Sequence, residues 1–592
     1  MLMNRGIYIS KIQRRMFFLS FATAFIAVFT QTLAVLIDNI IVCAFYGETE
    51  IAAVTLAGPF FYILEIPAAG LAAGIQTVCA KDIGAGQVDK VNRVFNQLFF
   101  FIGAVMVALT ALSFLFTPQM AFLFGARGNT ALLQPFAEQY IYGLSFEIVP
   151  YVLFCIMTPV VILDNGGRLV SIASVCGCIT DVVLDLLSVR FGWGLFGIGV
   201  ASSASAAVYF LITMLHFVSR ERVLRLRFAK IRFVEIRDVF VASVPKAVHS
   251  SADTLRSVIF ISLVSMTGGV VGTCVLSIHG TITYTVMIIA KGIAGAVGIM
   301  TGICWGEKNG EDLEGNGVLA HRYMLIATVC VVAVLLACAH SLSSALAESD
   351  ASAELLRFAI YCICATVPFA ILVLSRISYL QAIEHVREAQ WMGIASNLLL
   401  LTIAALLYIV PFGVRGVFMA FPTAQIMTLL ISWVIHRKRS EKAFPAGNDY
   451  LEVDDSFYTK PGDVISYPLE TIEDCALTSE QVVLFCRGHK IEDRKGFLAS
   501  VCVEELTTNA IEHGIKTHNG IKTADIRVVI DGDDVIIRLR DGGCAFNLKN
   551  FAKRLEKDDN LETGIGIKIM LTSAKSVSYY RTYGMNTTII KV

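Results

Sequence analysis

The sequence predicts an all-α polytopic membrane domain of twelve transmembrane helices in two six-helix bundles, followed by a C-terminal α+β sandwich domain. Three observations lead to this prediction. Hydrophobic residues make up 56% of the 592 residues, well above the share that is usual in soluble domains. Apolar runs of roughly 20 residues, long enough to cross a bilayer, recur as far as residue 436. Beyond that point the chain turns polar, and helical and strand patterns alternate.

The apolar runs define the expected spans. They lie near 16–45, 51–79, 94–124, 136–163, 168–190, 196–218, 239–266, 270–300, 322–346, 356–381, 392–410 and 415–436. The first run is too long for a cleavable signal segment, so we expect it to be a retained helix. Short similarities between the two halves, at an offset of about 220 residues, predict two related bundles over about 15–218 and 239–436.

Lysine and arginine residues gather on one side of this expected membrane domain. They occur at the N-terminus, in the loop after the sixth span and directly after the last span. Loops on the other side, such as Tyr46–Glu50 and Thr267–Gly269, contain none. By the positive-inside rule, both ends of the membrane domain lie in the cytoplasm. We therefore expect a multi-pass protein of a bacterial inner membrane.

Charge and cysteine content exclude two other classes of protein. The formal net charge is zero and charged residues make up only 16% of the chain, so no basic excess recruits nucleic acid. Most of the fifteen cysteines lie in apolar runs without CxxC spacing. We interpret them as reduced packing residues rather than as a disulfide framework.

The chain divides into three parts. Residues 1–439 form the expected membrane domain, 440–463 a polar, acidic and turn-rich linker, and 464–592 the expected soluble domain. In the soluble domain, Asp525–Ile530 and Val535–Arg540 alternate apolar and polar residues around a short acidic turn. That pattern predicts a β-hairpin.

Three carboxylates stand inside the expected spans. Asp38 lies deep in the first span, and Asp181 and Asp185 stand four residues apart on one face of the fifth. Carboxylates grouped in a low dielectric resist simultaneous ionisation, so at least one should hold a proton unless Na⁺ compensates it. The alternative is that they only make helix–helix hydrogen bonds or lie at a span end.

Other ionisable residues stand alone in their spans. They could line a central cavity, or equally pair structurally or snorkel toward the interface. These residues are Glu65, Glu147, Arg256, Lys291 and Arg376.

Around the grouped carboxylates, over roughly residues 15–436, the sequence resembles the multidrug and toxic compound extrusion (MATE) transporters. Asp38 stands between Ile37 and Asn39 as in the family's first helix, and Asp181 to Asp185 match its fifth, with Asp in place of the usual Asn. Gly194–Ser202 resembles the start of its sixth helix, with Ser202 at the Thr position. The resemblance implies an antiporter that exports drugs or metabolites of a cationic or amphipathic kind, with H⁺ or Na⁺ bound at Asp38, Asp181, Asp185 and Ser202.

The most specific motif of the soluble domain is a polar stripe in Val501–Gly514. Glu505, Asn509 and His513 stand four residues apart and therefore share one face of a helix. An Asn oxygen is a suitable ligand for Mg²⁺ between phosphates, and a Glu one turn earlier can act as a base. The alternative is an ordinary amphipathic helix with a solvated face.

Two glycine-containing motifs follow. The Asp541 carboxylate, after a predicted strand, can accept the adenine amino hydrogens, while Gly543 lets the backbone approach the ring. Gly564 and Gly566 precede a predicted helix, which places backbone N–H groups where phosphates bind. In this order the motifs resemble the ATP-binding domain shared by gyrase and histidine kinases, and within it the anti-sigma-factor serine kinases.

This second resemblance covers about residues 464–592. It implies ATP and Mg²⁺ as cofactors, with Glu505 as the catalytic residue, Asn509 as the Mg²⁺ ligand, and a sigma factor or an anti-sigma antagonist as a candidate partner. Two functions stay open. One is an ion-coupled exporter with a regulatory or serine-kinase-like tail. The other is a membrane sensor whose transporter-like half controls a kinase output.

Overall fold

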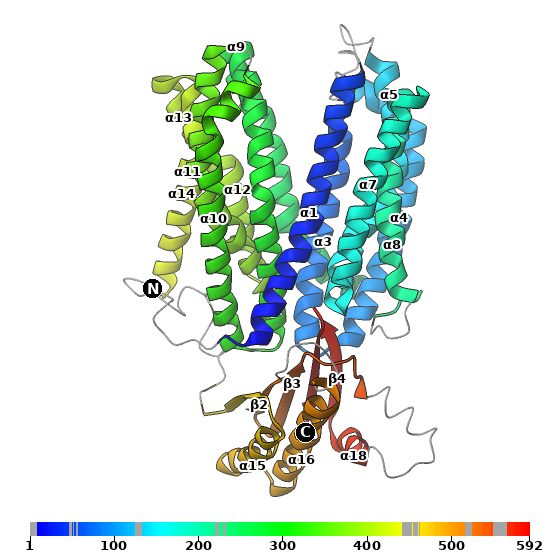
Figure 1. The fold of residues 1–592 in the computed structure, drawn as a ribbon, viewed down its shortest axis with the longest axis vertical. Coiled ribbons are helices and arrows are strands. Elements are labelled where there is room, and N and C mark those ends of the chain that lie inside the picture. Colours follow the sequence, from blue (N-terminus) through cyan, green and yellow to red (C-terminus); the bar gives the residue numbers. More distant parts are fainter. Residues whose placement is uncertain are drawn as a thin grey trace.

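The structure of the protein is a computed structural model. It describes residues 9–46, 50, 53–54, 57–124, 133–218, 224–228, 232–347, 349–440, 453, 457, 460, 462–515, 524–548 and 565–592. Side chains of residues 39, 43, 270, 439, 440, 513–515, 565, 566, 568 and 569 fall outside this description. Two helical bundles stand above a small domain built on a sheet (Figure 1).

The first bundle runs from α1 to η5. Its elements are α1 (Lys11–Phe45), α3 (Gly58–Gly84), α4 (Val88–Phe124), α5 (Gln134–Leu144), η3 (Ser145–Glu147), α6 (Ile148–Val161), η4 (Ile162–Gly166), α7 (Gly167–Phe191), α8 (Gly194–Met214) and η5 (Leu215–Val218). The second bundle contains α9 (Phe233–Gly306), α10 (Gly310–Leu346), α11 (Asp350–Ala382), α12 (Val386–Ile394), η6 (Ala395–Leu399), α13 (Leu400–Phe412) and α14 (Val414–Ser440).

Within the described residues, ten helical segments are long and apolar enough to cross a membrane. One of them, Gln134–Phe191, has 58 residues, about 87 Å at the rise of a helix, and therefore supplies two crossings. It is broken at η4, where Asn165 has a left-handed φ of 61°. The first half of α9, before a break at Gly269, is less apolar because it carries several charged residues, and it completes the twelve predicted crossings.

Helix ends differ from the apolar runs that predicted them. α3 covers Gly58–Gly84 rather than 51–79, and α10 starts at Gly310 rather than near residue 322. The Asn309 side chain caps α10 by accepting a hydrogen bond of 3.3 Å from the Asp312 backbone N–H. The helix therefore starts at its cap, about three turns before the run that hydropathy detects.

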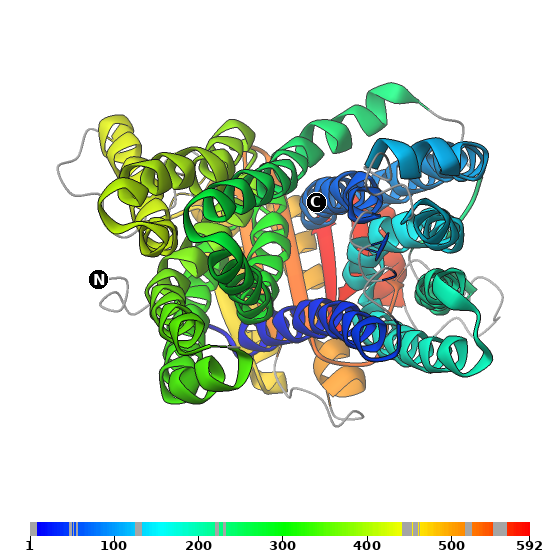
Figure 2. The ribbon, with the colours of Figure 1, turned by 90° about the horizontal axis from the view of Figure 1, so that it is seen from above.

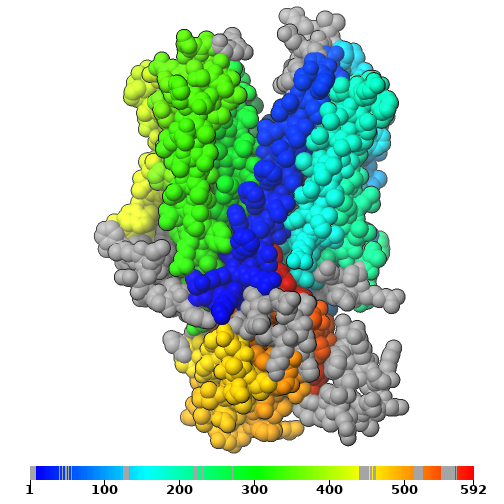
Figure 3. Space-filling view, viewed as in Figure 1, coloured from blue at the N-terminus to red at the C-terminus, as the bar shows by residue number. Residues whose placement is uncertain are grey.

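The two bundles meet at one end and diverge at the other. Figure 3 shows a V-shaped hollow between them on the side away from the C-terminal domain. α3 and α1 both pack against α9 and so join the bundles. At its start α1 lies beside the second bundle, where the Gln13 amide donates to the Asn316 side chain over 3.0 Å.

Glycines allow the bundles to approach closely at the end next to the C-terminal domain. A Cβ on Gly84 of α3 would overlap the carbonyl oxygen of Ile303, and a Cβ on Gly306 of α9 would overlap that of Lys81. The Lys81 ammonium also pairs with the Glu384 carboxylate in the turn between α11 and α12. The membrane domain is therefore closed beside the C-terminal domain and open on the opposite side.

The C-terminal domain is an antiparallel sheet covered on one face by helices. Its elements are β1 (Val464–Leu469), α15 (Ile472–Gly488), α16 (Asp493–Asn509), η9 (Ala510–Ile515), β2 (Ala524–Asp531), β3 (Asp534–Asp541), α18 (Ile565–Ser573), β4 (Ser576–Thr582) and β5 (Met585–Lys591). The strand order is β1-β2-β3-β5-β4. The predicted hairpin is β2 and β3, which pair from Ala524 opposite Asp541 to Asp531 opposite Asp534. The α+β prediction is thus confirmed.

The two faces of this sheet have different partners. Apolar side chains on one face pack with the helices and form the core of the domain; they include Ile526, Val528, Ile537 and Leu539. Side chains alternate along a strand, so the residues between these point to the other face. That second face lies directly beneath the point where the two bundles meet (Figure 2).

Candidate functional site

A group of carboxylates lies inside the first bundle. Asp181 and Asp185 of α7 are 3% and 0% exposed. One oxygen of Asp181, both oxygens of Asp185 and one oxygen of Asp38 on α1 are buried without a hydrogen-bond partner. Buried carboxylate oxygens without donors are costly unless a proton or a cation compensates them.

The structure brings the three predicted aspartates together. The Asp38 side chain interacts directly with that of Asp185, and the charges of Asp38 and Asp181 also interact. Two carboxylates are both acceptors, so a proton or a cation between Asp38 and Asp185 would supply the donor that both lack. The helix-face spacing in α7 therefore predicted the position of this group.

Two further side chains lie with this group, although the sequence did not predict them as ion-binding residues. Glu147 of η3 interacts electrostatically with Asp38 and Asp181, and its Oε2 is buried without a partner. The Tyr140 ring, 4% exposed, lies near the same carboxylates. In the sequence Glu147 is one of several lone charges, and only the packing of α5 and η3 against α8 shows where it points.

Ser202, the remaining residue predicted for ion binding, lies on α8. Its hydroxyl donates to the Ile198 carbonyl oxygen, 3.4 Å away and one turn earlier. In this structure that hydroxyl is therefore turned to its own helix rather than bonded to the carboxylates.

In the C-terminal domain, Glu505 and Asn509 face each other on α16. The Asn509 side-chain amide donates to the Glu505 carboxylate over 3.0 Å, so the two share the predicted polar stripe. The side chain of His513 and the whole of Gly564 lie outside the described residues. Gly566 falls in the first turn of α18, which packs against α16.

Asp541 ends β3 on the helix-covered face of the sheet. Its Oδ1 accepts hydrogen bonds of 2.8 Å from the Gly543 backbone N–H and from the Asn586 side-chain amide. Burial raises the pKa of Asp541, and these two bonds oppose that effect. A buried acceptor beside a glycine fits the recognition of an adenine amino group, so the described residues suit the predicted nucleotide site.

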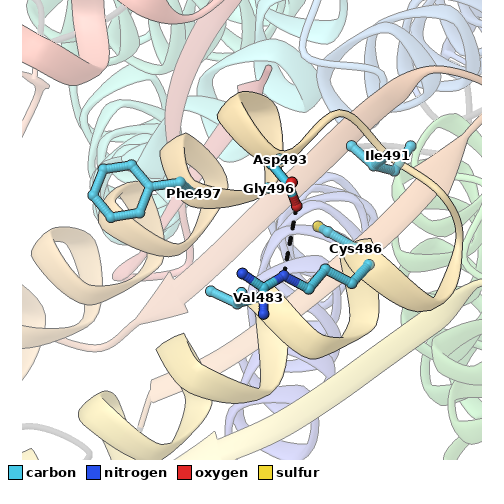
Figure 4. Close-up of a pocket in the computed structure, with 7 residues that line it drawn as sticks. Val483, Cys486, Ile491, Asp493, Gly496 and Phe497 are labelled. Atoms are coloured by element: carbon cyan, nitrogen blue, oxygen red, sulfur yellow. Dashed lines mark ion pairs between the residues drawn. The ribbon is translucent and has the colours of Figure 1, made fainter.

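A separate pocket lies between the end of α15 and the start of α16 (Figure 4). Its lining residues are Val483, Cys486, Arg487, Ile491, Asp493, Gly496 and Phe497. The Arg487 and Asp493 side chains pair across it at 3.5 Å. Asp493 and Asn509 stand at opposite ends of α16, so this pocket is distinct from the predicted nucleotide site.

The second face of the sheet binds the membrane domain through arginines. Arg540 of β3 contacts Glu307 and Asp312, at the turn between α9 and α10, with distances of 2.6 Å to each. Arg538 contacts the same two carboxylates. Burial alone would lower the pKa of Arg540, but Glu307 and Asp312 raise it well above its ordinary value. These buried charges therefore satisfy one another.

Arg527 of β2 completes this surface. It stands opposite Arg538 in the sheet and donates to the Asn309 side chain. Like charges directly opposite each other destabilise a sheet unless an acidic partner balances them. This surface was not predicted from the sequence, although the alternation of Arg527, Arg538 and Arg540 with apolar residues places all three on one sheet face.

The β4–β5 hairpin also contacts the membrane domain. Three hydrogen bonds join its turn to the first bundle: Thr582 to the Leu163 carbonyl oxygen (2.5 Å), Tyr583 to Ser20 (2.8 Å) and the Gly584 N–H to the Asn165 side chain (2.6 Å). Tyr583 and Gly584 have φ values of 52° and 80°, as a two-residue type I′ turn requires.

Comparisons with known proteins match both parts of the chain. The MatE family profile matches residues 23–187, and that of the histidine kinase-like ATPase domain matches residues 481–592. The probable multidrug resistance protein NorM of Agrobacterium fabrum is 21% identical over 301 residues, which cover 49% of this chain. The matched region spans 62% of that relative's length.

Solved structures of similar fold point the same way. An outward-facing multidrug resistance MATE family transporter of the MOP superfamily is 20% identical with a TM-score of 0.68, covering 74% of this chain and 97% of its own. A mutant of the Vibrio cholerae MATE transporter VcmN is 13% identical with a TM-score of 0.67, covering 74% and 99%. At these identities the likeness concerns the fold. Together with the two family matches, it shows a membrane domain with the fold of MATE transporters, part of which matches the MatE family, followed by a C-terminal domain that matches the histidine kinase-like ATPase domain family.

Proposed function

We propose that the protein is an antiporter that exports drugs or metabolites in exchange for H⁺ or Na⁺, and that its C-terminal domain binds ATP as a regulatory or serine-kinase-like module. The carboxylate group of the first bundle carries this proposal. Asp38, Asp181, Asp185 and Glu147 all have buried oxygens without donors. Such oxygens favour the uptake of a proton or a metal cation.

Cation binding changes how closely α1 and α7 can approach each other. A proton or Na⁺ between Asp38 and Asp185 removes the repulsion between the two helices and favours their approach. A cationic or amphipathic substrate competes for the same negative charge. Because the cation and the substrate favour different arrangements of the bundles, entry of the cation down its gradient drives export. Ser202 joins the cation ligands when its hydroxyl turns away from Ile198.

The proposed location is a bacterial inner membrane, with both termini of the membrane domain in the cytoplasm. The basic residues Arg437 and Lys438 end α14 on the side where the C-terminal domain follows. In this orientation the V-shaped hollow faces the outside of the cell. The proposed domain division, 1–439, 440–463 and 464–592, is supported by the end of α14 at Ser440 and the start of β1 at Val464.

The C-terminal domain is proposed to hold ATP with Mg²⁺. Asn509 is the proposed Mg²⁺ ligand, and Asp541 with Gly543 binds the adenine. His513, Gly564 and Gly566 are the further proposed nucleotide-binding residues. ATP supplies a transferable phosphoryl group.

Glu505 is the proposed base of this domain. Held by its hydrogen bond to Asn509, it accepts the proton of a Ser or Thr hydroxyl on a partner protein, of the sigma-factor or anti-sigma-antagonist class.

A second candidate function is a membrane sensor whose transporter-like half controls the kinase-like domain. The C-terminal domain contacts both bundles, through Arg540 and Glu307 on one side and Gly584 and Asn165 on the other. A rearrangement of the bundles therefore changes the contacts of the domain that would provide the output.

Dye transport into everted vesicles separates the two functions. A fluorescent cationic dye is followed under an imposed H⁺ or Na⁺ gradient in the wild type, in Asp38→Asn, and in Asp350→Asn as an exposed control carboxylate on α11. Gradient-driven uptake that is lost in Asp38→Asn and kept in Asp350→Asn supports the exporter. No flux in the wild type, with ATP binding intact, favours the sensor.

A further inference from the structure

The C-terminal domain bridges the two bundles at the end where they touch. Its arginine face binds the α9–α10 turn of the second bundle through Glu307 and Asp312. Its β4–β5 hairpin binds η4 and α1 through Asn165 and Ser20. One rigid sheet thus holds both bundles, and the Tyr580 hydroxyl adds a bond of 2.8 Å to Glu307 from the hairpin itself.

We infer that this hairpin is a lock: docked as in this structure, it prevents the bundles from separating beside the C-terminal domain, and nucleotide bound at Asp541 loosens it. The lock consists of β4, β5 and their turn. The inference rests on the proposed nucleotide site and deepens the regulatory role of the domain.

Opening of the membrane domain toward the C-terminal domain requires the contact near Gly84 and Gly306 to part. The sheet cannot follow both bundles at once, so one set of its contacts must break. The ion pairs in the set on the second bundle are shielded from solvent, with Arg540 and Glu307 side chains 7% and 2% exposed. Water and salt therefore weaken them little.

The β4–β5 turn has a backbone conformation and a buried side chain that fit its contact with the membrane domain. Tyr583 is a bulky residue with positive φ, a conformation that is strained outside a defined context. Its side chain is 6% exposed and, with Met585, belongs to the hydrophobic core of the membrane domain. Asn165, which accepts the Gly584 N–H, also has positive φ. Two unusual backbone conformations thus meet at one contact.

The same hairpin holds the predicted adenine site from its other face. Asn586 of β5 donates to Asp541 and to the Cys544 carbonyl oxygen, each over 2.8 Å. Arg581 of β4 donates to the carbonyl oxygens of Gly543 (3.1 Å) and Gly584 (3.3 Å). Arg581 therefore joins the adenine site directly to the turn that contacts Asn165.

This arrangement sets the direction of the coupling. An adenine amino group that donates to the second oxygen of Asp541 draws negative charge from Oδ1, which accepts from Asn586, and so weakens that hydrogen bond. The weaker bond loosens the start of β5, directly after the turn. Nucleotide binding and docking therefore oppose each other, and by linkage a variant that undocks the hairpin must bind nucleotide more tightly.

Hydrogen–deuterium exchange of the full-length protein in detergent tests the lock. The comparison is between wild type and the double variant Arg538→Glu/Arg540→Glu, each with and without a non-hydrolysable ATP analogue and Mg²⁺. Arg487→Glu, a charge reversal in the separate pocket, is the matched control. Slow exchange of the β2 and β3 amides around Val528 and Ile537 shows that the domain remains folded in each variant.

The lock predicts faster exchange at residues 582–586 and 307–312 when the analogue is added to wild type or to Arg487→Glu. The double variant should show fast exchange there without nucleotide and bind the analogue roughly 5- to 150-fold more tightly, the usual range for coupled sites. Unchanged or slower exchange on addition of a saturating analogue overturns the inference, as does a hairpin that stays protected in the folded double variant. If the analogue does not bind at all, the proposed nucleotide site fails instead, and the nucleotide-controlled lock fails with it. Absence of dye transport leaves these exchange results unaffected and counts only against the exporter.

Discussion

The side-chain amide of Asn586 donates a hydrogen bond of 2.8 Å to the carboxylate of Asp541. Asn586 lies on β5 between Met585 and Thr587, whose side chains point to the opposite face of the sheet. Met585 belongs to the core of the membrane domain. Successive residues of one strand therefore contact the predicted adenine site and the membrane domain, which gives a short physical route between the two.

Replacement of Asp541 by Asn should weaken ATP binding without loss of stability. The amide keeps an oxygen for the Gly543 N–H and for Asn586, but it presents an NH₂ group where adenine needs an acceptor. Leaving this polar group without its partner costs about 1–3 kcal/mol, which lowers the affinity for ATP roughly 5- to 150-fold. Isothermal titration calorimetry with ATP provides the measurement, and unchanged affinity would contradict the assigned role.

Replacement of Asp541 by Asn should also change how the stability of the protein depends on pH. Burial raises the pKa of Asp541 above its unfolded value of about 4. The folded state therefore holds the proton more tightly, and this group's contribution to stability falls as pH rises above about 4. Asp541→Asn should unfold at a temperature no lower than wild type at pH 7, with its relative advantage shrinking toward pH 4. If Asp541→Asn is less stable than wild type at pH 7, other groups must offset the cost of burying the Asp541 charge.

Replacement of Glu505 by Gln should separate ATP binding from phosphoryl transfer. Gln keeps the oxygen that accepts the Asn509 amide but cannot take up a proton. Loss of a general base typically costs 10²- to 10⁴-fold in rate, whereas ATP affinity should stay near that of wild type. Glu504→Gln, on the neighbouring exposed position of α16, is the control. Equal phosphate release or partner phosphorylation by Glu505→Gln and wild type would remove Glu505 from the catalytic role.

Replacement of Asp185 by Asn should abolish gradient-driven transport and stabilise the fold. Asp185 is 0% exposed and neither oxygen has a donor, so a neutral side chain of similar shape removes an uncompensated buried charge. We expect a higher unfolding temperature in detergent together with loss of dye efflux. Full transport by Asp185→Asn would rule out the part of Asp185 in coupling.

Replacement of Ser202 by Ala should leave folding normal and raise the cation concentration needed for half-maximal transport.

Replacement of Gly84 by Ala should disfavour the closed arrangement of the bundles. The added Cβ overlaps the carbonyl oxygen of Ile303, and overpacking of this kind costs about 1–3 kcal/mol. Hydrogen exchange near residues 303–306 should become faster because this end of the bundles opens more often. Gly280→Ala is the control, since a Cβ there meets no atom within 4 Å. Equal exchange in both variants would show that the contact does not hold the bundles together.

Local patterns predicted most of the fold. Hydropathy predicted the twelve crossings, and strand alternation predicted the β2–β3 hairpin, because each depends on neighbours along the chain. The start of α10 was missed because the Asn309 cap, rather than hydrophobicity, sets it. Likewise, the four-residue spacing of Asp181 and Asp185 placed both on one face of α7, which the structure turns toward Asp38.

Contacts between distant segments could not be predicted in this way. Glu147 joins Asp38 only because η3 and α1 pack in the same bundle. The pairing of Arg540 with Glu307 connects residues more than 200 positions apart, and the sequence shows only that each could take a charged partner. Alternation along β3 limits Arg540 to one face of the sheet, but the partner of that face depends on how the two domains dock.

The proposed antiport requires that an ion gradient, and not ATP, drives transport. The decisive experiment uses the full-length protein in sealed liposomes with a fluorescent cationic dye. An imposed H⁺ or Na⁺ gradient without nucleotide should drive dye movement, and ATP with Mg²⁺ on the side of the C-terminal domain, without a gradient, should drive none. Transport that requires ATP and proceeds without any ion gradient would contradict the account.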